Sequence, residues 1–372
     1  MIAKNSLIIA KNSLQTVFFN IHCRLNFVKK VVDTLKYSFR SDYCEMAHPF
    51  VLEALSAVGY TQFDGYGLDE FSMRAAELVR EKIHKPSADV HFIAGGTHAN
   101  LVLISSALRP HEAVIAPEGG HIFMHETGAI EATGHKICVV KGENGKLSVA
   151  DIEAVVAEHD DEHMVNPRLV YVSLSTECGT VYTKAELTAI AECCRKNNLY
   201  LYVDGARLGA AINSPACDLT YCDVADLADA FYIGGTKNGA LFGEAIVICS
   251  DVLKVDFRHI IKQRGAMLAK GAAIGVQFEA LLKDGLYDKL ASHALAMALK
   301  LADGIRAAGY GFLYPPETNL MVPVFPANLA ARLHQSYGFH DWQKIGEMTA
   351  VRIVTSWATP EKIVDEFIAD LG

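Results

Sequence analysis

A lysine that follows a buried strand is the most reactive side chain that the sequence offers. In FYIGGTKNGALFGEA, Lys237 comes after a run of apolar residues and lies among glycines, which let other groups approach the backbone closely. Burial lowers the pKa of an ammonium group, and the neutral amine condenses with an aldehyde to form an imine, a Schiff base. The competing interpretation is a lysine at a strand end with its ammonium group in solvent.

A carboxylate at the end of a second strand is a candidate partner for a charged ring nitrogen. YLYVDGARLGA places Asp204 after four residues that suit a buried strand, and Arg207 follows on the same turn. In a pyridoxal-phosphate site, such an Asp keeps the pyridinium nitrogen protonated, so that the ring accepts electrons. Taken alone, an Asp204–Arg207 pair or a helix N-cap explains the motif equally well.

A third motif has the features of a phosphate site. HFIAGGTHANLVLISSAL reads as a strand followed by Gly96 and Thr97 at the start of a helix. The free N–H groups and the positive dipole end of a helix N-terminus bind phosphate. Each motif is common by itself, but a phosphate cradle, an acid and a lysine in this order indicate one cofactor site.

These motifs lie on a repeating pattern of strands and helices. Apolar or β-branched runs alternate with amphipathic segments such as 184–197, which predicts an α/β domain with a mostly parallel, seven-stranded sheet covered by helices. Ligands in such sheets bind at the carboxyl ends of the strands, where the three motifs lie. The strand candidates are residues 91–95, 113–117, 137–141, 169–175, 200–205, 230–235 and 245–250.

The pattern changes after about residue 270. A long helical run over 275–309, which Gly285 and Gly304 make prone to interruption, leads to a turn at Pro315-Pro316, two strand candidates and a closing helix at 360–371. We therefore expect a large cofactor-binding domain over residues 37–280, with an N-terminal arm at 37–60. A small C-terminal α+β domain is expected over residues 281–372.

The first 36 residues differ from the rest. Residues 1–32 contain lysine and arginine but no acidic residue, and MIAKNSL is followed by its near copy IIAKNSL. This composition suits a non-globular extension or an organelle-targeting segment. Because no small-residue cleavage site follows an apolar stretch, we favour the extension and expect a cytoplasmic protein.

Composition excludes several classes of protein. Lys and Arg number 34 against 43 Asp and Glu without a basic block, which argues against nucleic-acid binding. The nine cysteines are scattered, and Cys193 and Cys194 are adjacent in a helical pattern, which disfavours a disulfide framework. No run approaches the roughly 18 apolar residues of a membrane span.

At this point a family resemblance emerges. GGTHAN, HIFMHETG, the Asp-Gly-Ala-Arg at 204–207 and the Lys237 loop resemble the threonine aldolase and β-eliminating lyase family, from roughly Tyr37 to the C-terminus. The resemblance implies a type I aminotransferase-like fold, pyridoxal 5'-phosphate as cofactor, and a homodimer or homotetramer with sites at subunit interfaces. It also implies an amino-acid substrate: cleavage of β-hydroxy amino acids such as L-threonine or L-allo-threonine to glycine and an aldehyde.

The resemblance assigns His121 to the cofactor ring, on which its imidazole would stack, with Glu126 following at the family's spacing. A surface histidine at a helix N-terminus is the plainer interpretation of His121. His121 and His125 also have the spacing of metal ligands, but the chain offers no clear third ligand, and we expect no metal site.

Further positions match those of substrate and phosphate ligands in the family. Ser41 and Arg352 correspond to residues that hold the substrate carboxylate, and a guanidinium group suits this role because it pairs with a carboxylate through two hydrogen bonds. Arg207 lies near the cofactor in the family. Arg264 resembles a basic residue that reaches a phosphate, including across a dimer.

The sequence departs from the family beside the substrate. Where many members carry a histidine that meets the substrate hydroxyl, this chain has Glu177, and the lysine loop reads Thr-Lys-Asn-Gly. A carboxylate accepts the β-hydroxyl proton when its pKa is suitable. Glu177, His121, His125 and a bound water are the candidate bases.

Three alternatives to threonine cleavage follow from these observations. One is an aldolase that prefers aryl substrates such as phenylserine. A second is a β-eliminating lyase, which releases pyruvate and ammonia instead of glycine. A third, from a different class, is a non-catalytic module that binds a phosphate ligand at the Gly96-Thr97 turn and forms no imine.

Overall fold

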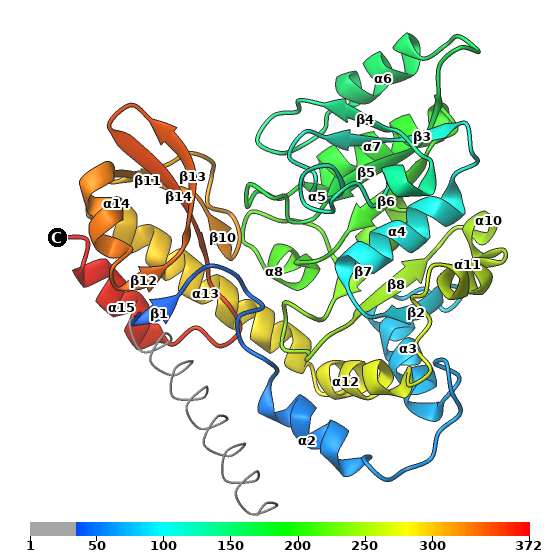
Figure 1. The fold of residues 1–372 in the computed structure, drawn as a ribbon, viewed down its shortest axis with the longest axis horizontal. Helices are drawn as coiled ribbons and strands as arrows, with labels where there is room; N and C mark the ends of the chain where they lie inside the picture. Colours follow the sequence, from blue (N-terminus) through cyan, green and yellow to red (C-terminus); the bar gives the residue numbers. More distant parts are fainter. Residues whose placement is uncertain (1–34) are drawn as a thin grey trace, which may run out of the picture.

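We describe the protein from a computed structural model, which covers residues 35–372 (Figure 1). The basic segment at residues 1–32, with its targeting interpretation, lies outside the described residues. Within the described part of the chain, no helix is long and apolar enough to cross a bilayer. The eight cysteines of this part are free thiols.

A seven-stranded sheet forms the centre of the large domain (Figure 1), and each of its strands was predicted from the sequence. Neighbouring strands are parallel except at β8, which runs antiparallel to both β2 and β7. The expected mostly parallel sheet is therefore confirmed. In spatial order the strands are β2 (Asp89–Ile93), β8 (Glu244–Ile248), β7 (Ala230–Gly234), β6 (Tyr200–Asp204), β5 (Asn166–Ser173), β3 (Glu112–Pro117) and β4 (Ile137–Val140).

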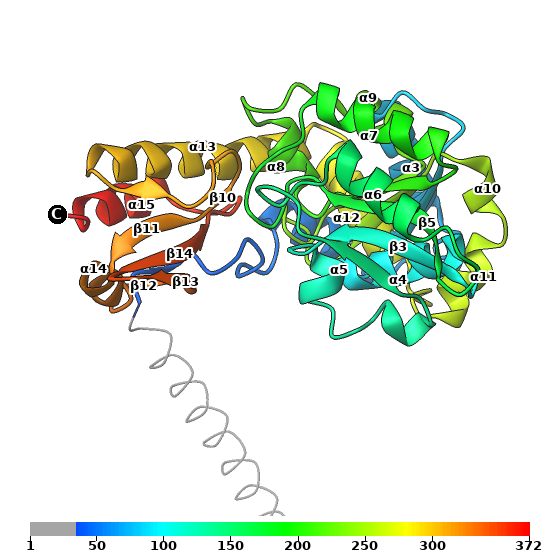
Figure 2. The same cartoon turned by 90° about the horizontal axis from the view of Figure 1, so that it is seen from above.

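Both faces of this sheet are covered by helices (Figure 2). Side chains alternate between two cores because successive strand residues point to opposite faces. In β7, Phe231 and Ile233 enter one core, whereas Ala230 and Tyr232 enter the other. The first core is closed by α3 (Glu70–Lys82), α6 (Val149–Glu158), α7 (Lys184–Lys196), α9 (Tyr221–Leu227) and α12 (Ala272–Leu282), and the second by α4 (Gly96–Ala107), α5 (His121–Met124) and α11 (Phe257–Gln263).

The helical run predicted over 275–309 is two helices and not one. It is divided between α12 and α13 (Leu286–Ala307) at Gly285, whose φ of 68° lies in the left-handed region that glycine favours. Gly304, in contrast, lies inside α13 without interrupting it. Tyr287 and Leu290, near the start of α13, belong to a large-domain core, whereas Leu301 and Ile305 belong to the small-domain core. This helix therefore joins the two parts of the molecule (Figures 1 and 2).

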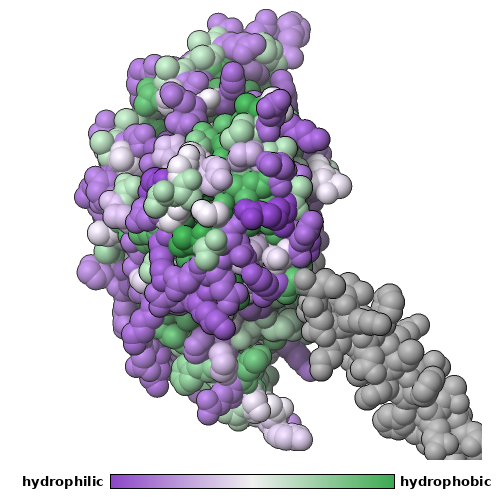
Figure 3. All heavy atoms as spheres, turned by 90° about the vertical axis from the view of Figure 1, so that its left-hand side faces the viewer, coloured by the Kyte–Doolittle hydropathy of each residue, from purple (hydrophilic) through white to green (hydrophobic). Residues whose placement is uncertain are grey.

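The small domain contains more strands than the two that the sequence predicts. Its sheet consists of β9 (Gly311–Phe312), β10 (Leu320–Met321), β11 (Pro323–Pro326), β13 (His340–Ile345) and β14 (Met348–Val354). Helices α14 (Ala327–Leu333) and α15 (Glu361–Ala369) pack with it, and α15 corresponds to the predicted closing helix. Figure 3 shows mainly hydrophilic residues with small hydrophobic patches on the outer face of this end.

The N-terminal arm contacts both parts of the molecule. Its strand β1 (Tyr37–Ser38) pairs in parallel with β12 (Tyr337–Gly338), and Phe39 enters the small-domain core. Helix α2 (Pro49–Ala57) packs against α12 on the large domain.

The boundaries of the large domain at 37–280 and of the small domain at 281–372 remain a proposal.

Candidate active site

Two adjoining cavities lie at the carboxyl edge of the central sheet. The inner cavity, of about 250 Å³, reaches down to Asp204 and the turn before α4, and the outer cavity, of about 470 Å³, opens toward the small domain. Lys237 lines both, so a group bound inside and a substrate outside would meet at its amine. Both cavities are lined by Tyr43, His121, Glu177, Arg207 and Lys237; the inner one adds Gly95, Gly96, Thr97, Asp204 and Glu244, and the outer one adds His125, Leu320, His340, Trp342 and Arg352.

Lys237 lies on the loop that joins β7 to the antiparallel strand β8. The base of this loop is closed by backbone hydrogen bonds from Gly235 and Thr236 to the carbonyl oxygen of Gly243, both 3.1 Å. A Cβ atom at Gly235 would lie 2.6 Å from that oxygen, which explains the glycine. Burial and the Arg207 guanidinium lower the pKa of Lys237, which favours the neutral, nucleophilic amine.

Asp204 ends β6 and is surrounded by hydrogen-bond donors. Its Oδ1 accepts from the hydroxyl of Tyr232 at 2.5 Å, and its Oδ2 accepts from the hydroxyl of Tyr171 at 2.7 Å. Burial and the charge of Asp204 raise the pKa of both phenols, which therefore stay protonated donors. The alternative of an Asp204–Arg207 pair is wrong, because Arg207 pairs with Asp42 instead.

The turn before α4 leaves the first backbone N–H groups of that helix without a side-chain cap. Gly95 occupies the N-cap position, and Gly96 and Thr97 begin the helix at the wall of the inner cavity. A Cβ atom at Gly96 would lie 3.1 Å from the hydroxyl oxygen of Tyr232. A larger residue would therefore crowd the hydroxyl group that donates to Asp204. Uncapped N–H groups at a cavity wall form an anion-binding surface.

A chain of hydrogen bonds links Asp204 to His121. The amide nitrogen of Asn100 lies 3.2 Å from Asp204 Oδ2 and 2.7 Å from Glu126 Oε1, and Nδ1 of His121 lies 2.7 Å from the same Glu126 oxygen. These contacts fix the imidazole ring at the cavity wall. His121 is the first residue of α5 and its side chain is 36% exposed, as the plainer interpretation expects, but its ring also lines both cavities. The described residues hold no cluster of three metal-ligand side chains.

Glu177 lines both cavities, and only one of its carboxylate oxygens is hydrogen-bonded among the described residues. Its Oε1 accepts hydrogen bonds from Ser173 Oγ at 2.8 Å and from the backbone N–H of His121 at 2.9 Å. Its Oε2 is buried and has no hydrogen-bond partner among the described residues. Burial and the neighbouring Asp204 raise the pKa of the Glu177 carboxyl group. This oxygen can accept a proton from a bound hydroxyl group.

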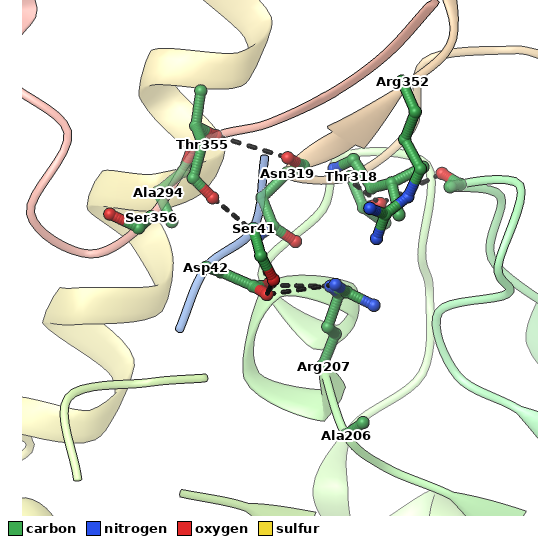
Figure 4. A network of polar contacts seen from close by, with 12 residues as sticks. Ser41, Asp42, Ala206, Arg207, Ala294, Thr318, Asn319, Arg352, Thr355 and Ser356 are labelled. Carbon is green, nitrogen blue, oxygen red and sulfur yellow. Dashed lines mark hydrogen bonds and ion pairs between the residues drawn. The ribbon is translucent and has the colours of Figure 1, made fainter. Parts of the chain in front are cut away.

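Arg207 is held by a residue that the sequence analysis did not select. Its Nε and Nη2 donate to the two carboxylate oxygens of Asp42 at 2.7 and 3.0 Å, and Asn319 donates to the same carboxylate at 2.9 Å (Figure 4). Burial would raise the pKa of Asp42, but the positive charges of Arg207 and Lys237 hold it below its usual value. Asp42 directly follows Ser41 in the sequence, and this adjacency was the one available signal.

Arg352 enters the outer cavity from β14, and Figure 4 shows its side chain near the Asp42–Arg207 pair. Its Nη1 donates to the backbone carbonyl oxygen of Arg40 at 3.2 Å. Burial and the charge of Arg207 lower its pKa to about 10. A bound carboxylate would relieve the cost of this buried charge. Ser41 does not line either cavity; its Oγ lies 3.4 Å from Asp42 Oδ1, beside the Asp42–Arg207 pair.

Arg264 is not brought to these cavities within the chain. It follows α11, where its Nε donates to Ser105 Oγ of α4 at 3.2 Å. A contact between Arg264 and a phosphate group would therefore have to involve a second copy of the chain.

Similarity to known proteins agrees with this arrangement. A family model described as "Beta-eliminating lyase" matches residues 38–327. A low specificity L-threonine aldolase of Pseudomonas sp. (strain NCIMB 10558) is 32% identical over 342 residues, covering 90% of this chain and 96% of the relative. The chain belongs to the threonine aldolase and β-eliminating lyase family. The expectation of a lyase is thereby confirmed.

Solved structures support the same family and fold. A Leishmania major threonine aldolase is 47% identical, with a TM-score of 0.89, and the match covers 90% of this chain and 98% of that protein. An aspartate aminotransferase of Thermus thermophilus, 15% identical with a TM-score of 0.67 over 95% of this chain and 94% of that protein, shares the fold alone. The family's type I aminotransferase-like fold is therefore confirmed.

Proposed function

We propose that this family member cleaves β-hydroxy amino acids such as L-threonine or L-allo-threonine to glycine and an aldehyde, with pyridoxal 5'-phosphate bound in the inner cavity. The observation that carries the proposal is the meeting of Lys237, Asp204 and the uncapped start of α4 around one cavity. The family supports it through relatives named low specificity L-threonine aldolase.

The residues around the inner cavity suit this cofactor. The N–H groups at Gly96 and Thr97 would hold its phosphate, Asp204 its ring nitrogen, and His121 would cover one face of the ring. Lys237 would bind its aldehyde carbon as a Schiff base. When bound, the cofactor accepts the electron pair released as the substrate's Cα–Cβ bond breaks.

The outer cavity suits the substrate. Arg352 lines this cavity and would hold the substrate carboxylate, and so orient the bond to be broken, together with Ser41, whose hydroxyl lies beside Asp42. Glu177 would accept the β-hydroxyl proton at its unpartnered Oε2, while Ser173 and the His121 N–H hold its Oε1 in place. We assign the role of base to Glu177 because its Oε2 has no hydrogen-bond partner among the described residues. His121 is the alternative base, since its contact with Glu126 engages Nδ1 and leaves Nε2 for a substrate proton.

One observation favours an aryl substrate as a second candidate. Trp342 and Tyr43, with Leu320, line the outer cavity, whose volume of about 470 Å³ exceeds the space that a methyl group needs. Trp342 is held edge-to-face against Tyr314 at 6.4 Å between ring centroids. A comparison of kcat/KM for phenylserine and threonine, repeated on Trp342→Ala, tests this candidate. A selective loss for phenylserine would support it.

The proposed function is tested by spectroscopy and product analysis. The visible spectrum of the purified protein with pyridoxal phosphate, before and after borohydride, should show a reducible band that is absent in Lys237→Ala and present in the exposed-site control Lys362→Ala. Glycine and acetaldehyde should form from L-threonine. Pyruvate and ammonia would instead indicate β-elimination. A protein that takes up no cofactor would contradict the proposal and favour the non-catalytic phosphate-binding module.

We further propose that the protein forms a homodimer or homotetramer. Large apolar side chains are exposed on the arm and on α3, and Arg264 does not line the cavities of its own chain. Sedimentation of the full chain tests the assembly. If each active site of a dimer contains Arg264 from the other copy, Arg264→Ala should weaken cofactor binding without preventing the two copies from associating.

A further inference from the structure

Glu244 is a buried carboxylate beside Lys237 to which the proposed mechanism assigns no role. It is 4% exposed and lines the inner cavity together with Lys237 and Asp204. Because β8 runs antiparallel to its neighbours, its first residue lies at the edge where the parallel strands end. The strand order thus brings a second acidic group to the reactive edge.

The position of Glu244 is fixed by the lysine loop. Its Oε2 accepts the backbone N–H of Gly235 at 2.8 Å, and Glu244 lies opposite Gly234 in the β7–β8 register. The hydroxyl of Thr236 accepts the N–H of Gly243 at 3.0 Å. The carboxyl group and Lys237 therefore lie on the same rigid hairpin.

The charges around Glu244 single out one cationic partner. Among the described residues, the ionisable groups that interact electrostatically with Glu244 are Lys237 on the loop, Asp204 on β6, and the phenols Tyr202, Tyr232 and Tyr287 on β6, β7 and α13. Burial raises the pKa of Glu244 to about 7, against hydrogen bonds from Thr236 and Gly235 and the charge of Lys237. Burial and Arg207 lower the pKa of Lys237, whereas the charges of Asp42, Asp204 and Glu244 raise it.

We propose that Glu244, held on the same hairpin and at the same cavity as Lys237, is a positioning residue whose carboxylate charge sets the charge state of the amine. An ionised Glu244 stabilises the ammonium form, whereas a neutral Glu244 leaves the amine free to attack an aldehyde carbon. The functional meaning of this pair rests on the proposed function, but the state of the amine is measurable without any cofactor.

The competing explanation is that Glu244 only closes the hairpin. Glu244→Gln separates the two, because the amide oxygen still accepts the Gly235 N–H while the charge is removed. Glu112→Gln is the matched control: Glu112 is also buried at the first position of a strand, and its Oε2 accepts the backbone N–H of Arg109 at 2.7 Å, away from both cavities.

The test is competitive acetylation of the cofactor-free, full-length protein with acetic anhydride across pH. Mass spectrometry compares the Lys237 peptide with that of Lys362, whose side chain is 86% exposed. In Glu244→Gln we expect the midpoint of Lys237 labelling to fall by about 1 pH unit, which makes the amine about tenfold more reactive below that midpoint. Glu112→Gln should match the unmodified protein. A midpoint unchanged in Glu244→Gln would overturn the proposal.

A second variant keeps the test valid if Glu244→Gln does not fold. Thr236→Val removes a hydrogen bond that lowers the pKa of Glu244, so the carboxyl group stays neutral to higher pH. The Lys237 midpoint should then shift in the same direction by a smaller amount, and no shift would again overturn the proposal. A separate spectrum with added pyridoxal phosphate distinguishes the two proposals. If no reducible band forms but the midpoint shifts, the proposed function fails and the Glu244 pairing stands.

Discussion

Glu177 is the residue to which the proposed function assigns the transfer of the β-hydroxyl proton. One carboxylate oxygen is held by Ser173 and the His121 backbone, and the other has no hydrogen-bond partner in residues 35–372. Glu177→Gln keeps the acceptor geometry but removes the proton-accepting charge. We expect kcat for threonine cleavage to fall by about 10²- to 10⁴-fold with little change in the bound cofactor's spectrum.

The pH dependence of the unmodified enzyme gives a second measurement on Glu177. Because burial and Asp204 raise the pKa of this carboxyl group above 4.5, its basic form is lost as pH falls through the raised value. The decrease of kcat/KM at low pH should follow that ionisation. In Glu177→Gln, the residual activity should no longer show this decrease. An unchanged decrease would assign the base to another group.

Glu244 also predicts a change in stability with pH. Its pKa rises from an ordinary 4.5 to about 7 in the folded chain, so the folded state retains a proton that the unfolded state has lost. The stabilisation is complete below pH 4.5 and is lost as pH rises toward 7, at on the order of 1 kcal/mol per pH unit. Urea unfolding of the cofactor-free protein should show this slope reduced in Glu244→Gln. Parallel curves would contradict the raised pKa.

Among single residues, the sequence predicted those site residues that belong to local motifs. Asp204 ends a strand, and Lys237 and Gly96 each come shortly after one; the strand order brings the three to one cavity. Asp42, Asn100 and Glu244 were missed as site residues because their partners are distant in sequence. Asn100, for example, reaches Asp204 and Glu126, and no local pattern encodes those contacts.

Among the elements, α13 and α15 meet at a glycine. A Cβ atom at Gly304 would lie 2.4 Å from two side-chain carbons of Ile368, so the two helices approach more closely than any larger residue allows. Gly304→Ala improves helix propensity by up to about 1 kcal/mol but overpacks the contact by about 1–3 kcal/mol. We expect a net loss of on the order of 1 kcal/mol in the free energy of unfolding.

A double-mutant cycle in urea checks this explanation. Adding Ile368→Ala to Gly304→Ala should cost less than Ile368→Ala alone, because the new methyl group then occupies space that the smaller side chain vacates. Additive effects would indicate that the glycine is needed for another reason.

The elements with strong periodicity were the ones predicted well. The seven central strands and α7 combine apolar runs with clear ends, and α7 begins with a capping box between Thr183 and Glu186. In the small domain, β9 and β10 are two residues long, too short to show an alternation. They exist through pairing with β11 and β14, which only the tertiary fold supplies.

Across the whole molecule, Asp42 connects three parts of the chain. It belongs to the arm, its carboxylate binds Arg207 after β6, and Asn319 reaches it from the small domain (Figure 4). Asp42→Asn would leave the buried Arg207 charge without an ionic partner. We expect a loss of about 3–5 kcal/mol in the free energy of unfolding, and a raised KM because Arg352 and Arg207 share the outer cavity.

The matched control for this prediction is an exposed ion pair of the same type. Asp303 contacts Arg306 at 3.0 Å with both side chains more than half exposed, and Asp303→Asn should leave the urea midpoint nearly unchanged. If the two variants lost equal stability, the contacts of Asp42 with Arg207 and Asn319 would stabilise the fold no more than an exposed ion pair does.

The hairpin that carries Lys237 restricts how the chain can change in evolution. Most loops around a sheet edge tolerate insertions, because a longer connection adds little closure entropy. Between Lys237 and Glu244, however, an added residue would move the amine away from the carboxylate and slip the register of a strand buried along its whole length. The spacing from Lys237 to Glu244 should therefore stay constant among relatives that keep both residues, even where neighbouring loops differ in length.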